Sequence, residues 1–177
     1  AGAPRAHLTS GGDGMHGATL GPSYDDDSID RHLAAMGVRG TRYADEAGLI
    51  AAVVEAIVAG ETVGWFQGRM EFGPRALGGR SIIADARSTK MQSVLNLKIK
   101  FRESFRPFAP SVLRERVRDY FELDADSPYM LLVAPVRESR RAPLSPEDQA
   151  VLRRDPDLIR RVNLPRSEVP AVTHVDY

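Results

Sequence analysis

Residues 68–81, GRMEFGPRALGGRS, constrain the fold of this chain more than any other segment, because they hold four glycines and three arginines. Bulky apolar side chains are few there, so neither a helical stripe nor a strand alternation runs through the segment. Glycine lets the backbone turn sharply and approach a ligand closely. Short apolar runs flank it at residues 62–66 and 81–84. The pattern predicts two strands joined by a glycine-rich loop.

Basic side chains are concentrated from this loop to residue 106. They include Arg69, Arg75, Arg80, Arg87, Lys98, Lys100, Arg102 and Arg106, against the acids Glu71, Asp85 and Glu103. Backbone N–H groups of glycine loops bind anions, and arginine forks match phosphate and carboxylate oxygens. The cations lie among glycines, apolar residues and stiffening prolines rather than in an alternating charged helix. We therefore predict a site for more than one phosphate group, with Glu71 and Glu103 orienting the cations.

The remaining elements follow from periodicity and from turn residues. Apolar spacing predicts a helix over residues 45–59, and shorter helices are expected over 30–36, 90–98 and 146–154. Residues 130–136 form an apolar run typical of a buried strand, and a strand is also expected to begin at 169. Residues 1–28 are rich in glycine, serine and aspartate and are predicted to form loops and turns.

Composition excludes several classes of protein. Lysine plus arginine equals aspartate plus glutamate at 24 each, whereas a general duplex-binding protein has a basic excess. The chain has no cysteine, so thiolate metal sites and disulfides are excluded. No apolar run approaches the ~20 residues of a membrane-spanning helix. We expect a cytoplasmic protein with no membrane partner.

Two segments together carry a family resemblance. GWFQGRMEFGPRALGGRSIIADAR at 64–87 and NLKIKFRESFRPFAPSVL at 96–113 resemble the signature of the carbamoyltransferase family, which includes enzymes of antibiotic biosynthesis and of nodulation-factor decoration. Weaker similarity extends to residues 11–24 and 170–176. Gly79 departs from the pattern, since the family commonly has asparagine there.

The resemblance implies an α/β fold of mixed α+β type with two parts. Residues 1–40 would be the tail of a Kae1/actin-like domain, and residues 41–177 a YrdC/Sua5-like domain with an open twisted sheet. The chain is expected to be the C-terminal portion of a longer enzyme and to be incomplete at its own C-terminus. Such a fragment could be inactive alone, and its partner would be the missing N-terminal domain.

The resemblance also implies a reaction. In the family, ATP and carbamoyl phosphate give carbamoyl adenylate and pyrophosphate, and the carbamoyl group then passes to a hydroxyl of a small molecule. The catalytic cations would be Arg75, Lys100 and Arg106. Binding of carbamoyl phosphate and ATP would add Arg69, Arg80 and Arg102.

A divalent metal, iron or magnesium, is also implied by the resemblance. Asp13 corresponds to a family aspartate that completes a metal site with two upstream histidines, although an aspartate between glycines is commonly a turn residue. His174 and Asp176 belong to the family's THVD element, for which a polar strand end is the favoured interpretation. His7, His16 and His32 are interpreted as ordinary histidines without a ligand role.

Two further alternatives remain at this point. The chain could be a YrdC-like RNA-binding or tRNA-modification-related module without carbamoyl transfer. Neutral charge and few aromatic residues among the cations disfavour nucleic acid. A homodimer is also left open.

Overall fold

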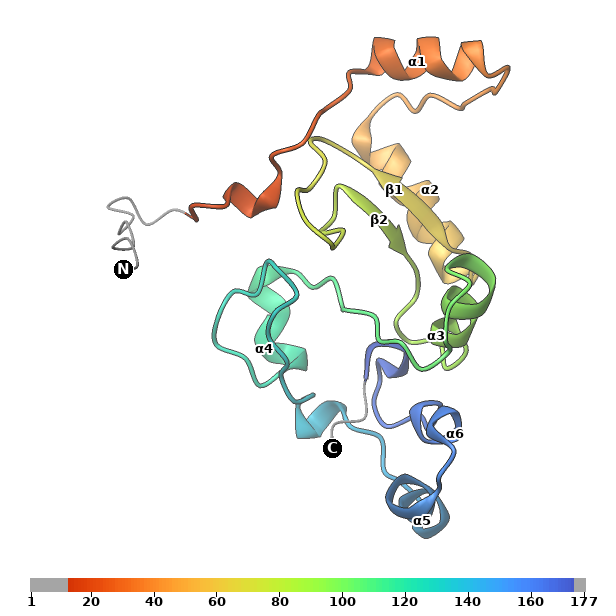
Figure 1. The fold of residues 1–177 in the computed structure, drawn as a ribbon, viewed down its shortest axis with the longest axis vertical. Helices are drawn as coiled ribbons and strands as arrows, with labels where there is room; N and C mark the ends of the chain where they lie inside the picture. The colour runs from red at the N-terminus through yellow and green to blue at the C-terminus, as the bar shows by residue number, and fades with distance from the viewer. Residues whose placement is uncertain (1–12, 174–177) are drawn as a thin grey trace, which may run out of the picture. The chain divides into compact units, whose positions relative to one another are not determined.

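A computed structural model describes residues 13–173 of the chain (Figure 1). The helices are α1 (Asp26–Ala35), α2 (Glu46–Val58), α3 (Met91–Val94), α4 (Val117–Tyr120), α5 (Pro146–Arg154) and α6 (Leu158–Val162), and the strands are β1 (Val63–Phe66) and β2 (Arg80–Ile83). A π-helix, η2 (Leu95–Ile99), follows α3, and short 3₁₀ turns are η1 (His16–Ala18), η3 (Arg114–Arg116), η4 (Glu138–Arg140) and η5 (Pro170–Val172). The mixture of helices with a small sheet agrees with the predicted α/β class.

The chain divides into two compact units. Among the described residues, unit 1 comprises residues 13–50, 64–82 and 127–131, and unit 2 comprises residues 51–63, 83–126 and 132–173. The division crosses α2 and the outer ends of both strands.

The strand–loop–strand prediction is confirmed by β1 and β2, which pair as one two-stranded sheet. The Gln67 N–H donates to the Gly79 carbonyl oxygen at 3.0 Å, which continues the antiparallel register beyond the strand ends. A second segment lies alongside the loop, because the Gly21 N–H donates to Met70 O at 2.8 Å and the Met70 N–H donates to Pro22 O at 2.9 Å. The glycine-rich loop is therefore held on both sides by backbone hydrogen bonds.

Helix boundaries follow from capping side chains. The Asp25 carboxylate accepts the Ser28 N–H at 2.8 Å, so α1 begins at Asp26 and not at residue 30 as periodicity predicted. The helix predicted at 146–154 is confirmed as α5, where Ser145 accepts the Asp148 N–H at 3.1 Å. The helix predicted at 45–59 is confirmed as α2. Its Ile50, Val54 and Val58 lie exposed at four-residue spacing.

The small core of unit 2 lies at α3 and η2. Met91, Leu95 and Ala171 are buried together, with Val94 and Phe108 packed against them. The Ala171 N–H donates to Ala86 O at 3.1 Å, which ties η5 to the residues after β2. The helix predicted over residues 90–98 thus forms, but its second half widens into a π-turn.

The prediction of a buried strand at 130–136 is wrong for this structure. Leu131 is 70 % exposed and Val133 is 77 % exposed, and the described chain offers them no sheet. The segment's one ladder contact is the antiparallel bridge between Phe121 and Val136. An apolar run becomes a buried strand only where neighbouring strands satisfy its backbone. The strand expected from 169 is replaced by η5 up to Val172, and residues 174–177 lie outside the described part.

Within residues 13–173, no helix is both long enough and apolar enough to cross a membrane.

Candidate functional site

The glycine-rich loop between β1 and β2 closes around one buried carboxylate. Glu71 is 7 % exposed, and its Oε1 accepts the N–H of Leu77 at 2.8 Å and of Gly79 at 2.5 Å. A Cβ on Gly79 would lie 2.8 Å from the Arg69 carbonyl oxygen and 3.1 Å from Glu71 Oε1. A side chain at this position would force the Arg69 carbonyl or the Glu71 side chain to move, and glycine avoids that movement. Glu71 orients the loop backbone and not the cations, contrary to the prediction.

The hydrogen bonds to Glu71 also control its ionisation. Burial raises the pKa of Glu71, but N–H groups of Leu77, Gly79 and others donate to the charged form, and the net result is a pKa below the ordinary value. A lowered folded-state pKa stabilises the protein above the unfolded-state pKa, and this stabilisation is lost as pH falls through the folded-state pKa. The closed loop should therefore depend on the carboxylate form.

We expect Glu71→Gln to lower the free energy of unfolding at pH 7, because the amide lacks the charge that strengthens both hydrogen bonds. The difference from the parent should shrink as the pH falls below the ordinary glutamate value of 4.5 and through the lowered pKa. Urea unfolding between pH 7 and pH 3 measures both effects. A difference that stayed constant over this range would contradict the role of the charge.

Two arginines of the glycine-rich loop donate hydrogen bonds to backbone carbonyl oxygens. The Arg80 guanidinium donates to Gln67 O at 2.9 Å, to Gly79 O at 2.7 Å and to Gly68 O at 3.2 Å. It also stacks 3.5 Å from the Phe66 ring centroid. Arg69 donates to Thr19 O at 3.2 Å and to Leu20 O at 3.3 Å. These guanidinium groups stabilise the loop conformation.

Arg75 differs from these two arginines. It is exposed at the outer part of the loop, between Glu71 and the Leu77 N–H that Glu71 binds. Its side chain has no hydrogen-bond or ion-pair partner among residues 13–173. All its guanidinium donors are available to an anion. Hydrogen bonds with Glu71 and Arg80 thus fix the loop backbone, while the Arg75 guanidinium has no partner among the described residues.

The second basic segment, residues 98–110, is organised by another buried polar residue. Asn96 is fully buried, and its amide nitrogen donates to Ser104 O at 3.0 Å and to Arg106 O at 2.9 Å. Its amide oxygen accepts Arg102 Nε at 2.7 Å. Gln92 also donates to Arg106 O, at 3.2 Å. We name residues 96–106, closed by Asn96, the basic loop.

The cations of the basic loop have different partners. Arg102 is bound to Asn96 and lies 5.0 Å from the Phe108 ring centroid. Arg106 Nε lies 3.1 Å from Glu103 Oε2 in an exposed pair, which confirms that Glu103 orients a cation. Lys100 is exposed at the end of the π-helix, where its N–H donates to Leu95 O at 2.9 Å. The Lys100 ammonium has no partner among the described residues.

Sequence reasoning missed two features of this loop. A single asparagine inside the apolar pattern MQSVLNL was the available signal for Asn96, because a buried amide needs hydrogen-bond partners. Phe101 has a φ of 48° and is 84 % exposed. A positive φ on a bulky residue costs about 1–3 kcal/mol and is commonly found at functional sites. No sequence pattern predicted this conformation.

Asp13 acts as a turn residue in the structure. Its carboxylate accepts the Met15 N–H at 3.0 Å and the Gly17 N–H at 2.9 Å. These two hydrogen bonds lower the pKa of Asp13. Within residues 13–173, no three histidine, aspartate or glutamate side chains gather as a metal site would require. His7, His174 and Asp176 lie outside the described residues.

The predicted site residues therefore fall into three groups. Arg75 belongs to unit 1, while Lys100 and Arg106 belong to unit 2 on one closed loop. Arg69, Arg80 and Arg102 have backbone or side-chain partners within the chain. Among residues 13–173, the side chains of Arg75 and Lys100 have no partner, and each lies on a loop that internal hydrogen bonds hold closed.

Comparison with known proteins identifies the family. The model of the carbamoyltransferase C-terminus matches residues 54–177. An uncharacterized protein of Synechocystis sp., sll1178, is 57 % identical over 166 residues, which cover 93 % of this chain and 26 % of that protein. The 3'-hydroxymethylcephem-O-carbamoyltransferase of Streptomyces clavuligerus is 46 % identical over 88 residues, which cover 50 % of this chain and 17 % of that enzyme.

Nodulation protein NolNO of Sinorhizobium fredii is 52 % identical over 90 residues, which cover 49 % of this chain and 13 % of NolNO. The chain thus spans about a quarter or less of these relatives. The chain belongs to the carbamoyltransferase family and matches its C-terminal part. The family resemblance read from the two motifs is confirmed.

Proposed function

We propose that this chain is the donor-activating portion of an ATP-dependent O-carbamoyltransferase. The observation that carries the proposal is Arg75, whose side chain has no partner among residues 13–173 and whose loop backbone is fixed by Glu71 and Arg80. No ion pair with a described residue has to break before this guanidinium binds an anion. Family membership supplies the chemistry, since the cephem enzyme is named for O-carbamoyl transfer.

The proposed substrates are ATP and carbamoyl phosphate. Water first takes the phosphoryl group of carbamoyl phosphate, which releases phosphate and leaves carbamate. A carbamate oxygen then attacks the α-phosphorus of ATP, which forms carbamoyl adenylate and releases pyrophosphate. Arg75 and Lys100 would neutralise phosphoryl oxygens whose charge shifts as these groups depart. A hydroxyl of a small molecule then accepts the carbamoyl group and AMP leaves.

Arg106 is the third proposed cation. Its pair with Glu103 is exposed, with both side chains 54 % accessible, and such pairs contribute about 0–1 kcal/mol. A phosphate can therefore replace Glu103 at little cost. Arg69, Arg80 and Arg102 are proposed to act through the loops that they hold, and their remaining N–H groups can also reach a ligand.

The finer architecture is also part of the proposal. We propose a YrdC-like domain from residue 41, preceded by the tail of a Kae1-like domain, with the acceptor hydroxyl bound by the remainder of the enzyme. Both oxygens of Asp13 accept backbone N–H groups, and among residues 13–173 it belongs to no group of three possible metal ligands. A metal role for Asp13 therefore depends on the two histidines expected upstream of this chain.

The test is product release by the whole enzyme that carries this chain. We expect pyrophosphate and phosphate in a one-to-one ratio when ATP and carbamoyl phosphate are both present, and no pyrophosphate when either is omitted. Coupled assays for the two products measure this ratio. Pyrophosphate release without carbamoyl phosphate would contradict the proposal. Absence of release together with tight, salt-sensitive RNA binding would favour the RNA-binding alternative.

A further inference from the structure

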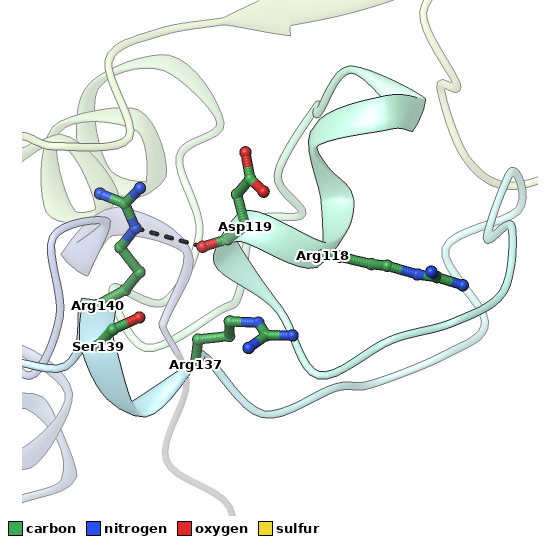
Figure 2. Close-up of a pocket in the computed structure, with 5 residues that line it drawn as sticks. All are labelled: Arg118, Asp119, Arg137, Ser139 and Arg140. Carbon is green, nitrogen blue, oxygen red and sulfur yellow. Dashed lines mark hydrogen bonds between the residues drawn. The ribbon is translucent and has the colours of Figure 1, made fainter.

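A basic hollow lies in unit 2, apart in sequence from both loops described above. It has a volume of about 500 Å³ and is lined by Arg118, Asp119, Arg137, Ser139 and Arg140. Figure 2 shows Arg137 and Ser139 on the segment that faces the backbone of α4, with Arg118 extending away from Arg140. Three of the five lining residues are arginines, whose guanidinium groups are suited to binding anions.

The two walls of the hollow are fixed to one another by the backbone. Phe121 and Val136 form an antiparallel bridge. On either side of it, the Arg137 N–H donates to Tyr120 O at 2.8 Å and the Glu122 N–H donates to Pro135 O at 2.9 Å. The Glu168 N–H donates to Arg140 O at 3.0 Å, which anchors the far end of η4. Arg137 and Arg140 therefore stand on backbone that is held at both ends.

The three arginines that line the hollow differ in their ion-pair and hydrogen-bond partners. Arg140 Nη1 lies 2.8 Å from Glu168 Oε2, its Nε donates to Asp119 O at 3.3 Å, and its guanidinium lies 4.8 Å from the Tyr120 ring centroid. Arg118 Nε lies 2.8 Å from Asp124 Oδ1. Arg137 has no side-chain hydrogen bond or ion pair within residues 13–173.

The one carboxylate in the lining of the hollow also has an ion-pair partner. Asp119, the one acid in its lining, lies 2.6 Å from Arg116 Nε. The Arg118–Asp124 pair is highly exposed, with side chains 69 % and 84 % accessible, so a competing anion can replace Asp124 at small cost. Arg137 is therefore the primary cation and Arg118 a second that a ligand can recruit.

We propose that this hollow binds a small organic phosphate, with the phosphoryl group on the Arg137 guanidinium and the Ser139 hydroxyl as a nearby donor. The hollow is an open depression of the surface, and its volume of about 500 Å³ exceeds what one phosphate ion needs. The lining is polar and positively charged, which selects an anion over an apolar ligand. The proposal does not depend on carbamoyl transfer, because binding at this hollow is measured without turnover.

The test is calorimetric titration of the full chain with inorganic phosphate and with AMP as a phosphomonoester, at 50 mM and 200 mM salt. We expect both to bind, AMP at least as tightly as phosphate, and affinity to fall with salt. Arg137→Gln should weaken both by about tenfold to a hundredfold, the range for losing a hydrogen bond to a charged group. The matched control is Arg153→Gln, which removes an exposed arginine of α5 that has no partner among the described residues.

Arg75→Gln separates this site from the glycine-rich loop. The proposal is supported if Arg75→Gln and Arg153→Gln bind as the parent does and Arg137→Gln binds at least about tenfold more weakly. Equal affinity of Arg137→Gln and the parent, loss only in Arg75→Gln, or no binding to the parent would each overturn it. A single-stranded RNA that bound with the salt slope of several phosphates and excluded AMP would overturn it as well. An unchanged urea midpoint for Arg137→Gln verifies that folding is intact.

Discussion

Replacing Arg75 with alanine is expected to reduce carbamoyl-dependent pyrophosphate release by about 10²–10³-fold, the usual effect of removing one preorganised donor. The free energy of unfolding should change by less than about 0.5 kcal/mol, because the side chain is exposed and has no partner in the described chain. Arg75→Ala should therefore lose pyrophosphate release while it keeps the stability of the parent. Pyrophosphate assays and urea unfolding of the whole enzyme measure the two quantities.

Two comparison variants make this result decisive. Arg39→Ala removes another exposed arginine of unit 1, also without a partner among residues 13–173, and should leave both quantities unchanged. Arg80→Ala should lower stability together with activity, because three loop carbonyls lose their donor. If Arg75→Ala retained parental turnover, the assignment of this cation to the donor site would be refuted.

Asn96→Leu is expected to produce the largest loss of stability, about 3 kcal/mol. Leucine leaves the carbonyls of Ser104 and Arg106 and the Nε of Arg102 without the amide that now binds them. An unsatisfied buried polar group costs about 1–3 kcal/mol. Gln92 still donates to Arg106 O, which limits the total. The midpoint of urea unfolding should fall with little change in its slope.

The control for this variant is Asn163→Ala. Asn163 is exposed and makes one long contact, 3.3 Å, with the Ser93 hydroxyl. It should cost less than about 0.5 kcal/mol. Similar losses in both variants would show that Asn96 has no special role in closing the basic loop. Because Lys100 and Arg106 stand on that loop, Asn96→Leu should also reduce pyrophosphate release.

Local patterns predicted some elements well and others poorly. The apolar period predicted α2, and the helix expected at 146–154 in the charged, proline-punctuated segment forms as α5. The run at 130–136 failed because strand formation depends on neighbouring strands, and the described chain supplies one bridge at Val136. The helix expected at 90–98 changed into a π-turn after Val94, where the Lys100 N–H reaches the Leu95 carbonyl. Neither outcome could be read from residue spacing.

The sequence by itself determined the family, the glycine-rich loop between two strands and the concentration of cations around it, because these depend on residues near one another in the chain. Only the tertiary structure decided which of those cations are free. Arg69 donates to the carbonyl oxygens of Thr19 and Leu20, which lie about fifty positions away in the sequence. Arg102 donates to the amide oxygen of Asn96, which is buried and therefore needs this hydrogen bond. Hydrogen bonds between distant positions leave no period in a sequence. Only the structure could therefore show that the side chains of Arg75, Lys100 and Arg137 have no partner among residues 13–173.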